Sequence, residues 1–132
     1  MMQQHFHAII WIDHHQARIF RFNASDVDRD VIRPHDPTVH LHHKANTIGS
    51  GHAAVDRDFL KHVTESVSGA GAIMIVGPAS AKTELVSYIT VNAPHLATRL
   101  SAVEAADHPS DGELVALARK FFRANDRIHP PV

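Results

Sequence analysis

The feature that most constrains the fold is a continuous apolar run, Ala72–Val76 (AIMIV), with Gly71 before it and Gly77-Pro78 after it. A short apolar run between glycines is typical of a strand that is buried on both faces of a sheet. Such a strand needs a covering layer on each side. We therefore expect Ala72–Val76 to be the central strand of an α/β domain. The chain has 132 residues, the size of one domain, so we expect a single domain spanning residues 1–132.

The first part of the chain predicts an antiparallel meander. Phe6–Ile12 is rich in β-forming residues, and Ala17–Phe22 alternates between two faces, so both are expected to be strands. The short polar segment between them predicts a hairpin turn. Asn23–Asp30 is polar and is expected to be a loop. Thr38–His43 is expected to be a third strand, at an edge of the sheet because polar residues fill one of its faces.

The rest of the chain predicts alternating helices and strands. Apolar residues at helical spacing indicate a helix over about 55–68 and a second helix from a Ser80 cap to about Val91. A strand is expected over 99–105, between the second helix and the last one. Ser110 and Glu113 have the spacing of a capping box that opens a last helix. Its expected inward residues are Leu114, Val115, Leu117, Ala118, Phe121 and Phe122.

Three cations near the expected end of this last helix, Arg119, Lys120 and Arg123, suit the negative end of a helix dipole, and residues 126–132 are expected to fray. The predicted order is therefore β-β-β-α-β-α-β-α. Right-handed crossovers would then place helices on both faces of a five-stranded mixed sheet. This is the order of a ribonuclease-H-like fold.

Composition excludes several classes of protein. The chain has no cysteine, which excludes a disulfide scaffold, a thiolate zinc site and a cysteine nucleophile, and fits a reducing compartment. No run approaches the ~20 apolar residues that span a bilayer, and the N-terminus does not have the pattern of a signal peptide. We therefore expect a cytoplasmic protein without a membrane partner. Its oligomeric state stays open, a homo-oligomer included.

Histidine is unusually frequent, with 13 residues, and the formal net charge with histidine neutral is -1. Because roughly a quarter of ordinary histidines are charged at pH 7, they add about three positive charges, and the actual charge is about +2. The chain therefore lacks the overall cationic excess of a strong nucleic-acid binder, and only a local patch could serve that purpose.

The N-terminal strands also carry a family resemblance. The segment Ile9–Asp13 (IIWID), a short turn and then Ala17–Phe20 (ARIF), followed later by a glycine-containing loop before the first helix, resembles bacterial relatives of the archaeal and eukaryotic release factors. That group includes host-attachment-like proteins and small chains named translational machinery components. The resemblance covers the middle domain of such factors. It implies a ribosome- or RNA-associated protein of translation, acting in rescue, release or hibernation.

In release factors the loop before the first helix carries Gly-Gly-Gln, which enters the peptidyl-transferase centre. This sequence has Gly49-Ser50-Gly51-His52 at that place and no glutamine. The resemblance therefore predicts a non-enzymatic protein without peptidyl-tRNA hydrolase activity. Backbone N–H groups beside glycines, with cations near them, can still hold phosphate. The predicted RNA-contact residues are His42, His43, Lys44, Asn46, Gly49, Ser50, Gly51 and His52.

A metal-binding protein is one alternative. His40 and His42 would share a face of a strand, because side chains alternate with a period of two. Two imidazoles at that spacing can ligate Zn²⁺ or Ni²⁺, with a third ligand from His35 or elsewhere. The same pattern also fits exposed histidines of an edge strand that bind no metal, and nothing in the sequence fixes a third ligand.

A metal-dependent nuclease is another alternative. Ribonuclease-H-like nucleases hold two Mg²⁺ ions with carboxylates at strand ends, and the candidates here are Asp13, Glu104, Asp107 and Asp111. Against this, the apolar strand ends in Val76-Gly77-Pro78 with no acid, Asp13 suits a turn, and Asp111 suits a helix N-terminus. Gly77–Ser80 could hold an anion at a helix N-terminus, but a turn followed by a cap accounts for the segment without a ligand and is the preferred interpretation. No Gly-x-Ser-x-Gly nucleophile elbow is present.

Overall fold

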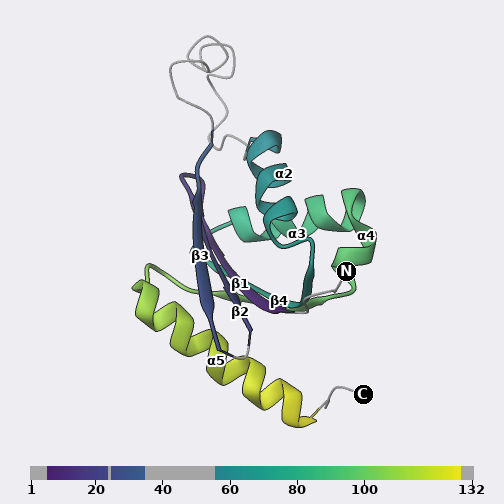
Figure 1. Ribbon diagram of the computed structural model, residues 1–132. Helices are drawn as coiled ribbons and strands as arrows, with labels where there is room; N and C mark the ends of the chain where they lie inside the picture. Colours follow the sequence, from purple (N-terminus) through teal and green to yellow (C-terminus); the bar gives the residue numbers. More distant parts are fainter. Residues whose placement is uncertain (1–5, 24, 35–55, 129–132) are drawn as a thin grey trace, which may run out of the picture.

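The computed structural model describes residues 6–23, 25–34 and 56–128. In this part of the chain five strands form one mixed sheet in the order β3-β2-β1-β4-β5. The strands are β1 (Phe6–Ile12), β2 (Ala17–Phe22), β3 (Val27–Ile32), β4 (Ala70–Gly77) and β5 (Leu100–Ala105). The helices in the same ranges are α2 (Arg57–Ser66), α3 (Ala81–Asn92), α4 (Pro94–Ala97) and α5 (Asp111–Ile128). Figure 1 shows α2, α3 and α4 on one face of the sheet and α5 on the other, as the sequence predicts.

The N-terminal hairpin has the predicted strand bounds. β1 and β2 pair antiparallel, from His7 opposite Phe22 to Ile12 opposite Ala17. The turn between them is closed by Asp13, whose Oδ1 accepts hydrogen bonds from the backbone N–H groups of His15 (2.7 Å) and Gln16 (2.9 Å). This is the local bonding that makes aspartate a favoured turn residue.

β4 is buried on both faces, as the apolar run predicts. Ile73 and Ile75 point into the core under α2 and α3, whereas Met74 and Val76 point into the core over α5. β4 is parallel to both of its neighbours, β1 and β5, so β1 and not β4 is the middle strand of the five. A Cβ at Gly77 would collide with the carbonyl oxygen of Ile12, so the strand end needs glycine for close approach.

The third described strand lies where a loop was expected. β3 begins at Val27, inside the stretch Asn23–Asp30, and pairs antiparallel with β2. The loop prediction was wrong because charged residues at an edge strand can face water while the backbone still pairs. Arg21 of β2 supports the pairing through ion pairs with Asp28 (2.8 Å) and Asp30 (3.5 Å). The strand predicted over Thr38–His43 lies outside the described residues.

Helix α2 (Arg57–Ser66) falls within the predicted range of about 55–68. Asp56 caps α2 by accepting a hydrogen bond from the N–H of Asp58 (2.9 Å). The predicted capping box of α5 is present: Ser110 N–H donates to Glu113 Oε1 (2.8 Å), and Glu113 N–H donates to Ser110 Oγ (3.1 Å).

Ser80 precedes α3 but does not cap it through its side chain, contrary to prediction. Its φ of -86° and ψ of -8° are helical, whereas a capping side chain needs an extended backbone. Pro94 follows the end of α3, as expected, and then begins the short helix α4, because proline is well suited to a first helical position.

α5 is longer than expected and continues to Ile128. Its predicted inward residues face the sheet: Leu114, Ala118 and Phe122 are buried, and Val115, Leu117 and Phe121 are partly buried beside them. None of the helices in the described ranges is both long enough and apolar enough to cross a bilayer.

Candidate functional site

The residues that the sequence predicts to contact RNA or metal lie outside the described part of the chain. The predicted loop residues from His42 to His52, together with His35 and His40, fall between Pro34 and Asp56, outside the described residues. Their roles stay predictions. The structure does place the four candidate carboxylates of the nuclease alternative.

Two of these carboxylates meet at one edge of the sheet. Because β1, β4 and β5 are parallel, their carboxyl ends lie at the same edge, where Asp13 follows β1 and Asp107 follows β5. Ligands of α/β sheets commonly bind at such an edge. His108 lies between the two acids, with Nε2 3.8 Å from Asp13 Oδ2 and Nδ1 3.1 Å from Asp107 Oδ1. Both ring nitrogens of His108 are therefore within ion-pair distance of a carboxylate.

Asp111 faces two arginines. Arg18 Nη1 donates to its Oδ1 and Arg29 Nε approaches its Oδ2, each at 2.8 Å. The hydrogen bond from Arg18 is the main cause that holds the pKa of Asp111 below its ordinary value of 3.8; burial opposes it, and the charge of Arg29 adds to it. Since both oxygens are held by guanidinium groups, this carboxylate is engaged as a structural anion.

The carboxylates do not form a metal centre within the described part of the chain. Glu104 lies exposed on the edge strand β5, and Asp107 is 92% exposed. No group of three or more histidine, aspartate or glutamate side chains in the described ranges is arranged to hold a metal ion. Gly77–Ser80 offers no better anion site, because Ser80 Oγ lies 3.4 Å from the carboxylate of Glu84.

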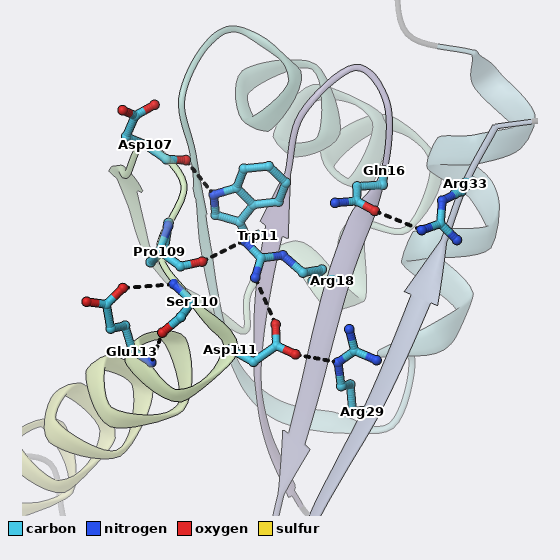
Figure 2. A network of polar contacts seen from close by, with 10 residues as sticks. All are labelled: Trp11, Gln16, Arg18, Arg29, Arg33, Asp107, Pro109, Ser110, Asp111 and Glu113. Atoms are coloured by element: carbon cyan, nitrogen blue, oxygen red, sulfur yellow. Dashed lines mark hydrogen bonds and ion pairs between the residues drawn. The ribbon is translucent and has the colours of Figure 1, made fainter.

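A polar network surrounding Trp11 organises this region (Figure 2). The indole is fully buried, and its Nε1–H donates to the carbonyl oxygen of Asp107 (2.9 Å). The guanidinium of Arg18 lies 4.6 Å from the indole ring centroid, a cation–π distance, and its Nη2 donates to the carbonyl oxygen of Pro109 (2.8 Å). The His108 ring contacts Trp11 from another direction, with centroids 5.1 Å apart. The network fixes the segment between β5 and α5 against β1 and β2.

Sequence reasoning did not identify Trp11, Arg18 or Arg29 as members of this network. A signal for Arg18 was present: it shares a strand face with Phe20 and Phe22, and an arginine on an aromatic face needs a partner when that face is covered. Arg18 Nε is nevertheless buried without a hydrogen-bond partner. The network is thus a structural clamp for α5, with Arg18 as its centre.

An open groove of about 360 Å³ lies between α2 and α3. Arg57 borders it, with its guanidinium 5.4 Å from the ring centroid of Tyr88, and Val91 is 76% exposed at its rim. Most of its lining residues carry polar or charged side chains, namely Arg57, Thr83, Glu84, Ser87, Tyr88 and Asn92. It has the character of a shallow surface between helices.

Comparisons with known proteins establish a shared fold. No family model and no curated protein matches the sequence. Solved structures do match: Archaeoglobus fulgidus Pelota (TM-score 0.60, 11% identity), the archaeal translation termination factor aRF1 (0.55, 20%) and S. cerevisiae Dom34 (0.56, 11%). Dom34 is described as a translation termination-like factor involved in RNA quality control pathways and interacting with Hbs1.

These matches cover 87%, 87% and 91% of this chain, but only 31%, 34% and 35% of Pelota, aRF1 and Dom34, respectively. The chain therefore spans about a third of the length of the proteins that it resembles. At such low identities the likeness concerns the fold. It agrees with the release-factor resemblance of the N-terminal strands.

Proposed function

We propose that this chain is a non-enzymatic, ribosome- or RNA-associated protein of the translation machinery. The observation that carries the proposal is the fold likeness, over most of this chain, to a translation termination factor and to a termination-like factor of RNA quality control. The release-factor resemblance of Ile9–Asp13 and Ala17–Phe20 supports it independently, since it rests on sequence.

The chain would correspond to the middle domain of a release or rescue factor, which agrees with its spanning about a third of Pelota, aRF1 and Dom34. The order of elements, an antiparallel meander followed by parallel crossovers, supports the finer assignment to a ribonuclease-H-like fold. A cytoplasmic location follows from the proposed role in translation.

The contact with RNA would be made by the segment between β3 and α2. Its proposed residues are His42, His43, Lys44, Asn46, Gly49, Ser50, Gly51 and His52, which supply cations and glycine backbone N–H groups for phosphate. His52 stands where the resemblance would require a glutamine, so the protein would bind without releasing a nascent peptide. Purified protein that released peptide from a stalled ribosome complex would contradict the non-enzymatic part of the proposal.

Co-sedimentation of the tagged protein with ribosomal fractions, at pH 6 and pH 7.5, tests the proposal. We expect association that strengthens at the lower pH, because ordinary histidines gain charge near pH 6.5, and that weakens with salt. A His42→Ala/His43→Ala/His52→Ala variant should lose this association. Failure of the wild-type protein to co-sediment at either pH would overturn the proposed function.

A matched control separates the loop from general charge. His15, His62 and His95 are exposed on other parts of the surface, so His15→Ala/His62→Ala/His95→Ala removes the same number of imidazoles. His7 is unsuitable as a control because its ring stacks on Phe122, with centroids 4.4 Å apart. Equal losses in the loop variant and the control would show that the loop has no special role.

A further inference from the structure

The C-terminal half of α5 carries a cluster of cations that the sequence explains incompletely. Arg119, Lys120 and Arg123 are exposed, and the one acidic residue in the C-terminal half of the α5 sequence is Asp126, which is accompanied by a further cation, Arg127. We call the three exposed residues the α5 basic face. Interaction with the helix dipole was the expected reason for them. The helix continues to Ile128, however, so Arg123 lies more than one turn before its end, where the dipole effect has faded.

The three cations form one contiguous surface. At about 100° per residue, positions 119, 120 and 123 fall within an arc of about 100° on the helix. The buried residues Ala118 and Phe122 lie outside this arc and pack against the sheet. All three side chains are exposed. Their helix, α5, lies on the side of the sheet opposite to α2 and α3 (Figure 1).

Among the side chains that the structure describes, no carboxylate forms an ion pair with these three cations. Every ion pair between described residues involves other side chains, namely His14, Arg18, Arg21, Arg29 and His108 with their acids. Arg119 places its guanidinium 5.3 Å from the ring centroid of Phe22, so an aromatic contact positions it. Three exposed cations on one helix, in a chain whose formal net charge is -1, are a local charge feature and not a consequence of composition.

We propose that the α5 basic face binds the phosphate backbone of RNA, as a second contact surface besides the segment before α2. The choice of RNA as the polyanion rests on the proposed function. Lysine and arginine that neutralise phosphates release condensed counterions, which gives binding independent of base sequence and strongly dependent on salt. The fixed spacing on a clamped helix lets the three side chains act together.

The test is binding of a fluorescently labelled RNA hairpin by the full chain, measured by anisotropy over a range of salt concentrations. Lys120→Gln/Arg123→Gln removes two charges and leaves the Arg119–Phe22 contact intact. We expect several-fold weaker binding at low salt and a salt slope smaller by roughly 1.5, at about 0.7 to 0.9 for each lost phosphate contact. Lys61→Gln/Lys82→Gln removes the same charge from α2 and α3 and should leave the slope unchanged.

Equal slopes and affinities for the two double variants would overturn the proposal, as would absence of hairpin binding by the wild-type protein at low salt. Displacement of the hairpin by poly-glutamate as efficiently as by unlabelled RNA would also overturn it, since the face would then bind acidic polymers in general. Circular dichroism of each variant confirms that the helices are intact.

Ribosome co-sedimentation distinguishes the two proposals. If the wild-type protein binds the hairpin through Lys120 and Arg123 but does not co-sediment with ribosomes, the inference on α5 holds and the proposed function fails. If the protein co-sediments but the hairpin result is negative, the proposed function holds and the inference on α5 fails.

Discussion

The two faces of the sheet are covered in different ways. The face under α2, α3 and α4 is filled mainly by aliphatic side chains, and its largest buried residues are Ile10, Ile12, Ile19, Phe59, Ile73, Ile75, Leu85, Ile89 and Leu96. The face under α5 is rich in aromatic side chains: Trp11, Phe20, Phe22 and Phe122 lie there together with Met74. Figure 1 shows α5 lying across this second face.

The two faces differ in the kind of side chain that fills the space between the sheet and its helices. Where three helices cover the sheet, apolar side chains suffice. On the face that α5 covers, Arg18 packs beside Trp11. Its guanidinium donates hydrogen bonds to Asp111 and to the carbonyl oxygen of Pro109. The other arginine of β2, Arg21, points to the three-helix face but stays at its edge, binding the exposed Asp28 and the carbonyl of Ser66. One strand thus carries a clamp toward α5 and a surface pair toward α2.

Neighbouring residues of β4 test the difference in packing directly, and here we expect the largest effect. Ile75→Ala, on the three-helix face, should cost about 2–5 kcal/mol of unfolding free energy through lost burial and a residual cavity. Met74→Ala, on the α5 face, should fall near the lower end of this range, because a single helix can shift to fill the space. Urea denaturation measures both.

Val103→Ala provides the control for this pair, since Val103 is 43% exposed on β5 and should change stability by less than about 0.5 kcal/mol. A cost below 1 kcal/mol for Ile75→Ala would contradict the buried, double-sided nature of β4.

The two arginines of β2 provide the second test. Arg18→Ala should cost about 2–3 kcal/mol, because it removes two hydrogen bonds and a cation–π contact from a side chain that is only 12% exposed. Arg21→Ala should cost about 0.5–1 kcal/mol, since its own side chain is 20% exposed and its acidic partners Asp28 and Asp30 are 65% and 46% exposed. Thermal and urea unfolding of both variants measure the difference.

A double-mutant cycle between Arg18 and Asp111 isolates their interaction, with Arg21 and Asp28 as the matched pair. Equal coupling in the two cycles would mean that the clamp contributes no more than a surface ion pair. The unpartnered Nε of Arg18 already limits its net contribution, because a buried donor without an acceptor is unfavourable.

The parts of the fold that were predicted correctly from the sequence are those set by local residue patterns. The bounds of β1 and β2 follow from β-forming runs around a turn, and the capping box of α5 needs only Ser110 and Glu113. β3 was missed because the segment Val27–Ile32 contains three charged residues and no apolar alternation over its first four positions. Its strand conformation depends on pairing with β2, a tertiary effect that overrides local preference.

The polar network was beyond prediction for a similar reason. The hydrogen bond from Trp11 to Asp107 joins residues 96 positions apart, and that from Arg18 to Pro109 joins residues 91 apart. An aspartate in the first turn of a helix is expected on local grounds alone. The sequence around Asp111 therefore does not indicate that it pairs with Arg18 and Arg29. Contacts of this kind follow from the sheet order, which the sequence suggests only coarsely.

Acid pH provides a third and smaller test of the clamp. The pKa of Asp111 is lowered in the folded protein, chiefly by the hydrogen bond from Arg18, so ionised Asp111 stabilises the fold above about pH 4 and this contribution is lost as pH falls through the folded-state pKa. Asp111→Asn should therefore be less stable than the wild-type protein at pH 7, and the two should converge toward pH 2. A stability difference between them that stays constant from pH 7 to pH 2 would contradict the assigned role of the carboxylate.

The smallest effect on stability is expected for Asp28, the exposed partner of Arg21. Asp28→Asn removes the charge that faces Arg21 but keeps the β3 backbone paired with β2, and Asp30 remains 3.5 Å from the same guanidinium. The change in unfolding free energy should therefore be below about 0.5 kcal/mol and should vanish in high salt, which screens exposed charges. Urea unfolding at low and high ionic strength measures it. A loss above 1 kcal/mol that persists in high salt would show that Arg21 is a second clamp and that the two faces of the sheet are held by equivalent networks.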